Sequence, residues 1–448
     1  MKVFPGQTIP ERANPADPAT RFPLWLPFIA ALAIRMAVVV LNYRATPDAA
    51  LHYERFGWEM GWIARSLAHG HGFSSPFFAV SGPTAMMPPL YPALIAVVFH
   101  LFGIYSVASA FVVLSLNSLF SSLICITVYF IAKHSFGTRL GYICAWAWAI
   151  HPFAIYFSAN RVWDYALTGL LFSICLCIAQ RLTAEHQWSA WLGFGMIYGL
   201  TALSNPAVLN VFPFLLLYAL YNAYNKSGST LRLGRAPIAL AGVIVIVLPW
   251  TIRCERAMHV LCPVRDNFWQ EFWAGNTGDA SNPMPGWTHP ASNPAEMRKY
   301  LASGEVAYIA QKRAMAVDIV RHHPGLFATR SFRRVVYFWT GFWSLSPAYL
   351  HDEPFEVPNV FFCSALTLFM LMGLVRFLRG NRSAALPYAV FVAIFPLIYY
   401  VTHPLMDYRQ PIEPEILVLI VFALFPSKAS EWQAESEARE LEPQLLTL

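Results

Sequence analysis

The sequence is short of charged side chains. Lys, Arg, Asp and Glu together make up 12% of its 448 residues, and 57% of the residues are hydrophobic. Soluble globular proteins carry about 25% charged residues, so this deficit argues for a polytopic membrane protein surrounded by the lipid bilayer. The net charge of +6 is spread over many loops and forms no basic stripe. We therefore expect no nucleic-acid partner.

Ionisable side chains are also scarce inside the apolar runs. Arg35 alone falls well inside a predicted span, and we expect it to face the protein interior because an arginine in lipid is costly. Ion-coupled transporters usually need carboxylates or histidines at mid-membrane, so the scarcity indicates chemistry at a membrane surface instead. Other ionisable residues lie near segment ends: His151, Asp164, Arg376, Glu413 and Glu415.

Cysteine usage gives little information about function. Five of the seven cysteines lie in apolar runs, where a thiol usually serves packing. Cys254 and Cys262 lie together in a polar loop, and in an exported loop they could form a disulfide. The sequence leaves this pairing open.

The apolar runs predict an all-α integral membrane protein with about ten transmembrane helices, juxtamembrane amphipathic helices and a long exported loop. The predicted parts are an N-terminal transmembrane module (1–252) with a first exported loop (43–107), an exported loop (253–357), C-terminal transmembrane helices (358–426) and a cytoplasmic tail (427–448). The predicted spans are 24–42, 108–132, 140–157, 163–180, 188–203, 207–223, 237–252, 358–376, 384–401 and 412–426.

One short apolar run decides the topology. Leu90–Gly103 has only about 14 residues, with Pro88, Pro89 and Pro92 around its start, and runs of this length are more often re-entrant or interfacial than spanning. If this run does not cross, most Lys- and Arg-bearing loops fall on the cytoplasmic side together with both chain ends, as the positive-inside rule expects. We therefore predict that 88–103 does not cross.

Polar segments on the exported side carry the predicted surface helices. Apolar residues recur at helical spacing over 54–68, which predicts an amphipathic helix with Glu59 and Trp62 on a different side. A plainer alternative is that Glu59 only pairs with Arg55 one turn earlier. The second exported loop predicts one helix over 295–322, with Asn293 as its N-cap, and then an interfacial helix that is basic on one side and aromatic on the other.

Several short motifs follow one another along most of the chain. They are Ala64-Arg65-Ser66-Leu67, Pro88-Pro89-Leu90, Asp164 in NRVWDY, PWTIR ending at Arg253, Gly275-Asn276, and Tyr408-Arg409 before Pro411. In this order they resemble the GT-C glycosyltransferases, and more narrowly the family 39-like enzymes such as protein O-mannosyltransferases and the lipid A aminoarabinose transferase. The resemblance implies an enzyme whose base is an acidic residue of the first exported loop.

One departure from the family concerns this base. By register, Phe56 and Gly57 occupy the positions of the family's usual Asp-Glu pair. Glu59 is the nearest acidic residue in the helix, with Asp48 and Glu54 as rivals and Asp164 as a further acidic candidate. A carboxylate is needed because an attacking hydroxyl or amine must lose a proton.

Fixed cations are expected at the leaving phosphate, because the guanidinium fork binds phosphate oxygens in pairs. The candidates for donor-phosphate binding are Arg409, Arg253, Arg265 and Tyr408, and those for substrate binding are Asn276, Trp273 and Arg65. His69 and His71 flank Gly70 in a glycine-rich turn, and we read them as loop residues; we expect no metal or other cofactor.

The sequence thus predicts an inverting membrane glycosyltransferase that moves a sugar from a polyprenyl-phosphate donor to an acceptor at the outer face of the inner or plasma membrane. The alternatives are a flippase or other transporter of lipid-linked sugars and a non-catalytic membrane scaffold. The sugar and the acceptor are not specified by the sequence.

Overall fold

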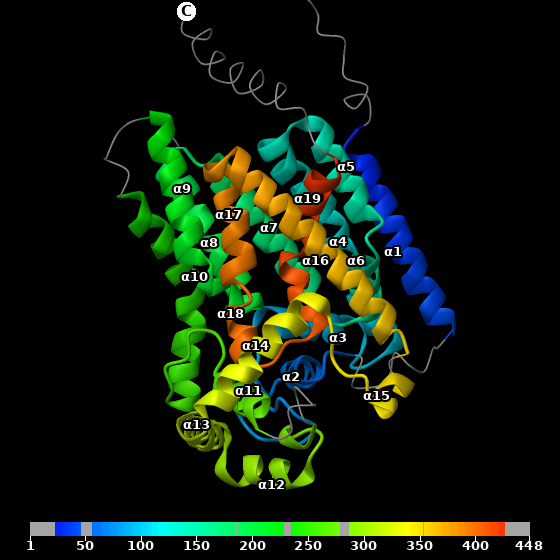
Figure 1. The fold of residues 1–448 in the computed structure, drawn as a ribbon. Coiled ribbons are helices and arrows are strands. Elements are labelled where there is room, and N and C mark those ends of the chain that lie inside the picture. Colours follow the sequence, from blue (N-terminus) through cyan, green and yellow to red (C-terminus); the bar gives the residue numbers. More distant parts are fainter. Residues whose placement is uncertain are drawn as a thin grey trace, which may run out of the picture.

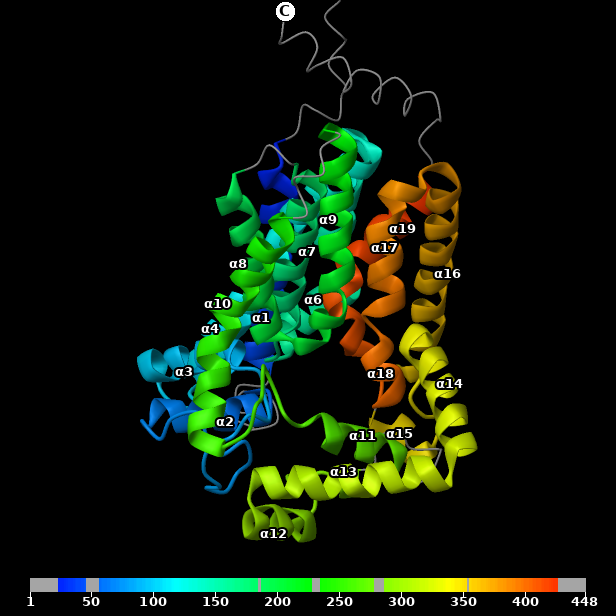
Figure 2. The same ribbon diagram turned by 90° about the vertical axis from the view of Figure 1, so that its left-hand side faces the viewer.

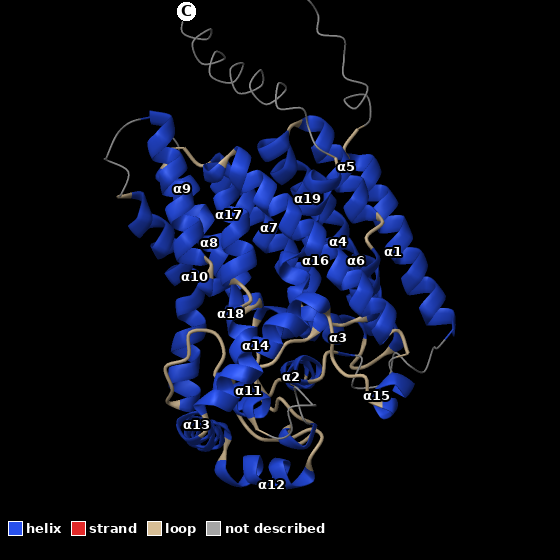
Figure 3. Ribbon diagram, viewed as in Figure 1, coloured by secondary structure: helices blue, strands red, loops and turns tan. Residues whose placement is uncertain are grey.

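The computed structural model describes residues 23–45, 56–183, 187–227, 234–277, 286–352 and 354–425. Within these ranges the regular structure is helical, and no strand is present (Figure 3). The expected all-α membrane fold is confirmed. Asp48 and Glu54, two of the predicted acidic candidates, lie outside the described residues.

Long helices form a bundle whose legs run alternately between two ends (Figures 1 and 2). In chain order the legs are α1 (Trp25–Ala45), α4 (Val107–Phe136), α5 (Thr138–Ala149) with α6 (Pro152–Asn160), α7 (Tyr165–Arg181), α8 (Trp188–Ser204), α9 (Phe212–Ser227), α10 (Arg235–Met258), α16 (Glu356–Gly380), α17 (Arg382–Ile394) with α18 (Leu397–Val401), and α19 (Glu413–Leu424). These legs correspond one by one to the predicted spans.

Shorter elements gather at one end of the bundle, which we call the loop end (Figure 2). They include α2 and α3 from the first loop and α11 to α14 from the second. Their bounds are α2 (Glu59–Ala68), α3 (Leu90–Phe102), α11 (Phe268–Asn276), α12 (Pro294–Ser303), α13 (Glu305–His322), α14 (Pro324–Thr340) and α15 (Pro347–Asp352), with 3-10 turns η4 (Pro206–Asn210), η5 (Gly286–Thr288) and η6 (Met406–Ile412).

Not every leg is long enough to cross a membrane by itself. Five described helices are long and apolar enough to cross a membrane, namely α1, α4, α10, α16 and the run Arg382–Val401. The pair α5 and α6 makes a sixth if both helices, which meet at a bend of 46°, belong to one span. The legs α7, α8, α9 and α19 have 17, 17, 16 and 12 residues. A count of ten crossings therefore stays a prediction.

The run at 88–103 forms α3, a helix of 13 residues. It lies across the loop end next to α2, and α4 then starts from that same end (Figure 2). At about 1.5 Å per residue a helix of this length is too short to cross the hydrocarbon core. Its placement agrees with the predicted non-crossing segment.

Arg35 is buried at the bend between α5 and α6. Its side chain donates to the carbonyl oxygens of Trp148 (3.1 Å) and Ala149 (3.0 Å) and to Ser121 Oγ (3.0 Å). These are the last two carbonyls of α5, where the regular helical hydrogen bonds end, and that of Trp148 also accepts from the His151 N–H (3.2 Å). The guanidinium supplies further donors at this helix end, and it faces the interior as expected.

Two details of the second exported loop differ from the sequence-based expectation. The single helix expected over 295–322 is two helices, because Gly304 has a φ of 75°, which an L-residue rarely adopts. Its expected start is confirmed, since the Asn293 side chain accepts from the Ala295 N–H. Cys254 and Cys262, whose pairing was left open, are both buried free thiols.

The topology can be tested with single cysteines on the two sides of α3 and α4. Val80 is 84% exposed in the first loop, and Arg139 is exposed at the other end of the bundle. Because α4 alone crosses between them, Val80→Cys and Arg139→Cys should react with an impermeant maleimide from opposite sides of the membrane. Labelling of both from the same side would mean that α3 crosses.

Candidate active site

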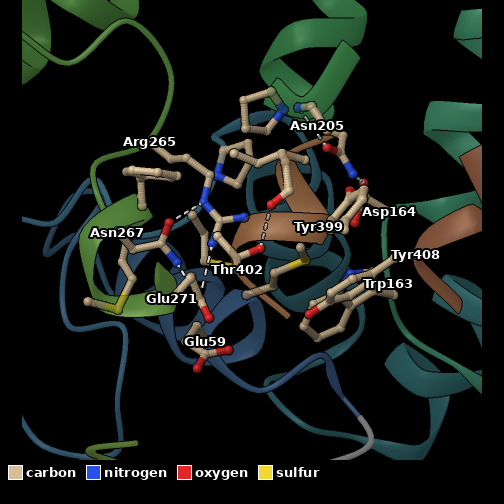
Figure 4. Close-up of a pocket in the computed structure, with 18 of the residues that line it drawn as sticks. Glu59, Trp163, Asp164, Asn205, Arg265, Asn267, Glu271, Tyr399, Thr402 and Tyr408 are labelled. Carbon is tan, nitrogen blue, oxygen red and sulfur yellow. Dashed lines mark hydrogen bonds and ion pairs between the residues drawn. The ribbon is translucent and has the colours of Figure 1, made fainter. Parts of the chain in front are cut away.

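A cavity of about 310 Å³ lies where the bundle meets the loop end. Its walls come from segments far apart in the sequence: α2, the residues before α3, the turn into α7, η4, the start of α11, His289, and the turn between α18 and α19. Figure 4 shows polar side chains from these segments pointing toward one another. Four predicted site residues line this cavity: Glu59, Asp164, Arg265 and Tyr408.

Glu59 is the first residue of α2 and is 8% exposed. Its Oε1 lies 2.7 Å from Nε2 of His289, which comes from the second long loop, between α10 and α16. Burial lowers the pKa of His289, but the hydrogen bond and negative charge of Glu59 outweigh it, so that the pKa is raised overall. The predicted pairing of Glu59 with Arg55 cannot be assessed, because Arg55 lies outside the described residues.

The backbone before α2 explains the missing Asp-Glu pair. Gly57 has a φ of 76°, and a Cβ there would lie 2.5 Å from the carbonyl oxygen of Val162. An acidic residue at this position is therefore incompatible with this backbone. Phe56 is fully buried, with its ring 5.4 Å from Phe99 and 5.3 Å from Tyr105. Glu59 is consequently the first described position of this segment that presents a carboxylate to the cavity.

Asp164 lies just before α7, on a different wall of the cavity from Glu59 (Figure 4). It is 2% exposed and accepts hydrogen bonds from Thr168 Oγ1 (2.8 Å) and Asn205 Nδ2 (3.3 Å). These donors hold one carboxylate oxygen, Oδ2, in place. The resulting geometry suits an acceptor of hydrogen bonds from a bound hydroxyl group.

Arg265 brings a cation to the same space. Its Nε donates to Asn267 Oδ1 (2.5 Å), and its Nη2 lies 3.6 Å from Oε1 of Glu271. Asn267 Nδ2 in turn donates to Glu271 Oε1 (2.8 Å). Figure 4 shows the guanidinium held by these partners near the middle of the cavity. The site thus combines carboxylates with one fixed guanidinium.

The sequence reasoning missed Glu271, His289, His403 and Asn205, which also line the cavity. His403 Nδ1 lies 3.6 Å from Glu271 Oε2, and its Nε2 lies 3.0 Å from the Tyr408 hydroxyl. Burial lowers the pKa of His403, so its ring is neutral at pH 7 and can hydrogen-bond that hydroxyl. The sequence does give a signal for two of these four residues. Glu271 lies shortly before the Gly275-Asn276 motif, and His403 lies shortly before the Tyr408-Arg409 motif.

Other predicted substrate residues have structural contacts outside the cavity. Asn276 donates to the Val401 carbonyl (2.9 Å) and accepts from Arg334 Nη2 (3.0 Å). Trp273 is buried, with the Lys312 ammonium 3.5 Å from its ring centroid. Arg65 donates to the Phe78 carbonyl (3.2 Å). None of the three lines the cavity.

Two of the predicted phosphate-binding arginines also lie outside it. Arg253 donates to the carbonyl oxygens of Thr84 (2.6 Å) and Phe73 and lies over the ring of Trp250. Arg409 is fully buried in a two-point pair with Glu413, at 2.7 Å from Nε to Oε2 and 3.1 Å from Nη2 to Oε1. Both arginines are thus engaged by protein groups outside the cavity, whereas Arg265 lines it.

Arg265 and Asn267 owe their placement to the residue between them. Asp266 hydrogen-bonds to Glu305, which also accepts from Thr84 Oγ1 (2.5 Å) and the Ala85 N–H (2.6 Å). Burial, reinforced by the charge of Glu305, raises the pKa of Asp266 to about 8. The two acids share a proton and join the start of α13 to the first exported loop.

Within the residues that the structure describes, no group of three or more His, Cys, Asp or Glu side chains is arranged to hold a metal ion.

Comparison with known proteins identifies the fold. Residues 86–252 match the family model described as dolichyl-phosphate-mannose-protein mannosyltransferase. The apo oligosaccharyltransferase of Archaeoglobus fulgidus is similar with a TM-score of 0.51 and 14% identity, over 92% of this chain and 52% of that chain. This chain has a GT-C glycosyltransferase fold. The resemblance inferred from the motifs is confirmed.

Two further solved structures are similar at lower scores. Apo ArnT from Cupriavidus metallidurans has a TM-score of 0.47 and 14% identity, over 89% of this chain and 61% of that one. The oligosaccharyltransferase AglB from Archaeoglobus fulgidus, in complex with an inhibitory peptide and a dolichol-phosphate, has a TM-score of 0.47 and 13% identity. The match covers 92% of this chain and 52% of that one. This chain thus spans about half to three-fifths of the length of these proteins. No curated protein sequence matches it.

The buried pair of Arg409 and Glu413 predicts a structural effect of mutation. Arg409→Ala leaves a carboxylate without its partner in the bundle and should lower the free energy of unfolding by about 3–5 kcal/mol. The double variant Arg409→Met with Glu413→Gln should recover much of this loss. Thermal unfolding in detergent measures both, with the exposed Arg379→Ala as control. If Arg409→Ala were as stable as the wild type but bound the donor more weakly, the result would contradict a purely structural role and support phosphate binding by Arg409.

Asp266 predicts a pH dependence of stability. Its pKa is raised in the folded state, so above its ordinary pKa the unfolded chain has already released the proton that the folded chain retains. Wild-type stability should therefore fall as pH rises from 5 to 8. Asp266→Asn removes this titration. The melting temperature of the variant, measured relative to that of the wild type, should therefore rise between pH 5 and pH 8. The exposed Asp318→Asn serves as control; a difference independent of pH would contradict the shared proton.

Proposed function

We propose that this protein is an inverting membrane glycosyltransferase that moves a sugar from a polyprenyl-phosphate carrier to an acceptor hydroxyl or amine at the cavity. The observation that carries the proposal is the placement of Glu59, Asp164 and Arg265 around one cavity at the loop end. The family match supports it, because that family's description names a dolichyl-phosphate-linked sugar as donor.

The reaction needs a base and a stabilised leaving group. The acceptor oxygen or nitrogen bonds to the anomeric carbon while the bond from that carbon to the phosphate oxygen breaks, and the phosphate leaves with the electron pair. Attack from the face opposite the phosphate inverts the configuration. The acceptor's proton passes to a carboxylate within hydrogen-bond reach, and we assign this role to Glu59. Asp164 is the second acidic candidate and is assigned to holding sugar or acceptor hydroxyls.

Arg265 is assigned to the donor phosphate. Its guanidinium faces the cavity and is held by Asn267 and Glu271 rather than by a fully buried pair. A held guanidinium needs little reorganisation when charge develops on the departing phosphate. Tyr408 lies on the same lining and can donate its hydroxyl to a phosphate oxygen.

The loop end is proposed to be the exported side of an inner or plasma membrane. The turns at the other end of the bundle carry Lys133, Arg139, Arg181, Arg379 and Arg382. An excess of Lys and Arg marks the cytoplasmic side. The sugar would then be transferred outside the cytoplasm, where a lipid-linked donor needs no nucleotide.

Substitutions of Glu59 test the base. Glu59→Gln keeps the size of the side chain but cannot take a proton, so the transfer rate should fall about 10²- to 10⁴-fold. The assay is release of polyprenyl phosphate from polyprenyl-phosphate mannose by protein in nanodiscs, with exposed Glu255→Gln as matched control. Full activity in Glu59→Gln together with its loss in Asp164→Asn would move the base to Asp164; full activity in both variants would contradict a base at either carboxylate, and a wild type that releases no polyprenyl phosphate would contradict the enzyme proposal.

Substitutions of Arg265 test the phosphate site. A charge-assisted hydrogen bond contributes about 1.5–3 kcal/mol, so Arg265→Gln should cost roughly ten- to a hundredfold in kcat/KM at limiting donor. Lysine keeps the charge without the fork and should recover part of the loss. The matched control is the exposed Arg321→Gln. An unchanged donor dependence in Arg265→Gln would place the phosphate elsewhere.

A further inference from the structure

His289 contacts Glu59 from a distant part of the sequence. Its Nε2 lies 2.7 Å from Glu59 Oε1, and both side chains line the cavity. Glu59 belongs to the first exported loop and His289 to the turn before α12 in the second. The contact therefore exists only when the two loops are folded against each other.

The surroundings of His289 fix its protonation pattern. Its Nδ1 accepts a hydrogen bond from the Ala291 N–H at 3.2 Å. A ring nitrogen that accepts carries no proton, so in this geometry the proton lies on Nε2 and is donated to Glu59. The backbone is also held, because the His289 carbonyl accepts from the N–H groups of Ser292 (3.0 Å) and Asn293 (2.9 Å).

Aromatic side chains restrict the imidazole ring. The ring of Phe77 lies 5.5 Å from it at 87°, and that of Trp58 lies 6.1 Å from it at 88°. The side chain of His289 is 14% exposed. A ring enclosed in this way cannot turn away from Glu59 without displacing these neighbours.

We propose that His289 is a positioning residue that holds the carboxylate of Glu59 directed into the cavity. The inference rests on the proposed function, in which Glu59 is the base. The hydrogen bond occupies Oε1, which leaves Oε2 to take the proton of the acceptor.

Other charged groups face this pair. Glu271 from α11 lies close enough for its charge to raise the pKa of His289. Arg265 contacts Glu271 on the same wall. Among the charged side chains that the structure describes around His289, Glu59 lies within hydrogen-bond distance of its ring, so loss of the imidazole should act mainly through Glu59.

Two substitutions separate the donor from the shape of the ring. His289→Phe keeps an aromatic ring between Phe77 and Trp58 but removes the donor. His289→Gln offers an amide N–H at about the place of Nε2. The matched control is His322→Gln, because His322 forms an exposed pair with Asp318 (3.0 Å) outside the cavity.

Transfer kinetics give the first readout, with polyprenyl-phosphate mannose as donor probe and full-length protein in nanodiscs. In His289→Phe, kcat should fall roughly ten- to a hundredfold while KM for the donor stays near the wild-type value. His289→Gln should recover most of kcat, and His322→Gln should match the wild type.

A second readout does not need turnover. Cryo-electron microscopy structures of the wild type and both variants in nanodiscs show where the Glu59 carboxylate points. The carboxylate should leave its place in His289→Phe and keep it in His289→Gln. An unchanged Glu59 side chain in His289→Phe would overturn the positioning role.

The two readouts distinguish failure of this inference from failure of the proposed function. An inactive wild type with the expected displacement of Glu59 in His289→Phe would contradict the proposed donor and leave His289 as the partner of Glu59. An active wild type whose kcat is unchanged in His289→Phe would contradict the inference and leave the proposed function standing.

Discussion

Backbone carbonyl groups at the loop end are hydrogen-bonded by buried arginines, and the cavity depends on these contacts. Arg334, 3% exposed, donates to the carbonyls of Val401 (3.1 Å) and Gly275 and so joins α14, α11 and α18. Gly275 is needed because a Cβ there would overlap the Thr402 carbonyl. Arg253 joins α10 to the first loop through the Thr84 carbonyl in the same way. Where water is excluded, such carbonyls are costly to leave unsatisfied, so the arginines determine how the loops close over the bundle.

The resulting cavity keeps Glu59 and Arg265 apart. Glu59 and Asp164 lie on different walls, and Arg265 lies beside Asn267 and Glu271 at the start of α11 (Figure 4). The proposed reaction requires this separation, because a direct pair of Glu59 with Arg265 would leave neither side chain available to the substrate. The structure keeps them apart by giving each its own partner, His289 for Glu59 and Asn267 with Glu271 for Arg265.

Much of the fold could be predicted from the sequence, because apolar runs, charge bias and proline spacing act locally. The legs of the bundle, the short helix α3 and the cap at Asn293 are examples. Contacts between distant segments could not be predicted. Arg253 and Arg409 have the same residue type as Arg265, but only the tertiary structure shows that carbonyl oxygens or Glu413 engage them. His289 carried no motif, since its role comes from folding of the second loop onto the first.

The central claim is that the cavity at the loop end receives the phosphate of a lipid carrier. A cryo-electron microscopy structure of the full chain in nanodiscs with undecaprenyl phosphate tests it most directly. We predict the phosphate inside the cavity, within hydrogen-bond distance of Arg265, with Glu59 facing the space beside it. Phosphate density at Arg253 or Arg409, or on the outer surface of the bundle with the cavity empty, would contradict the account.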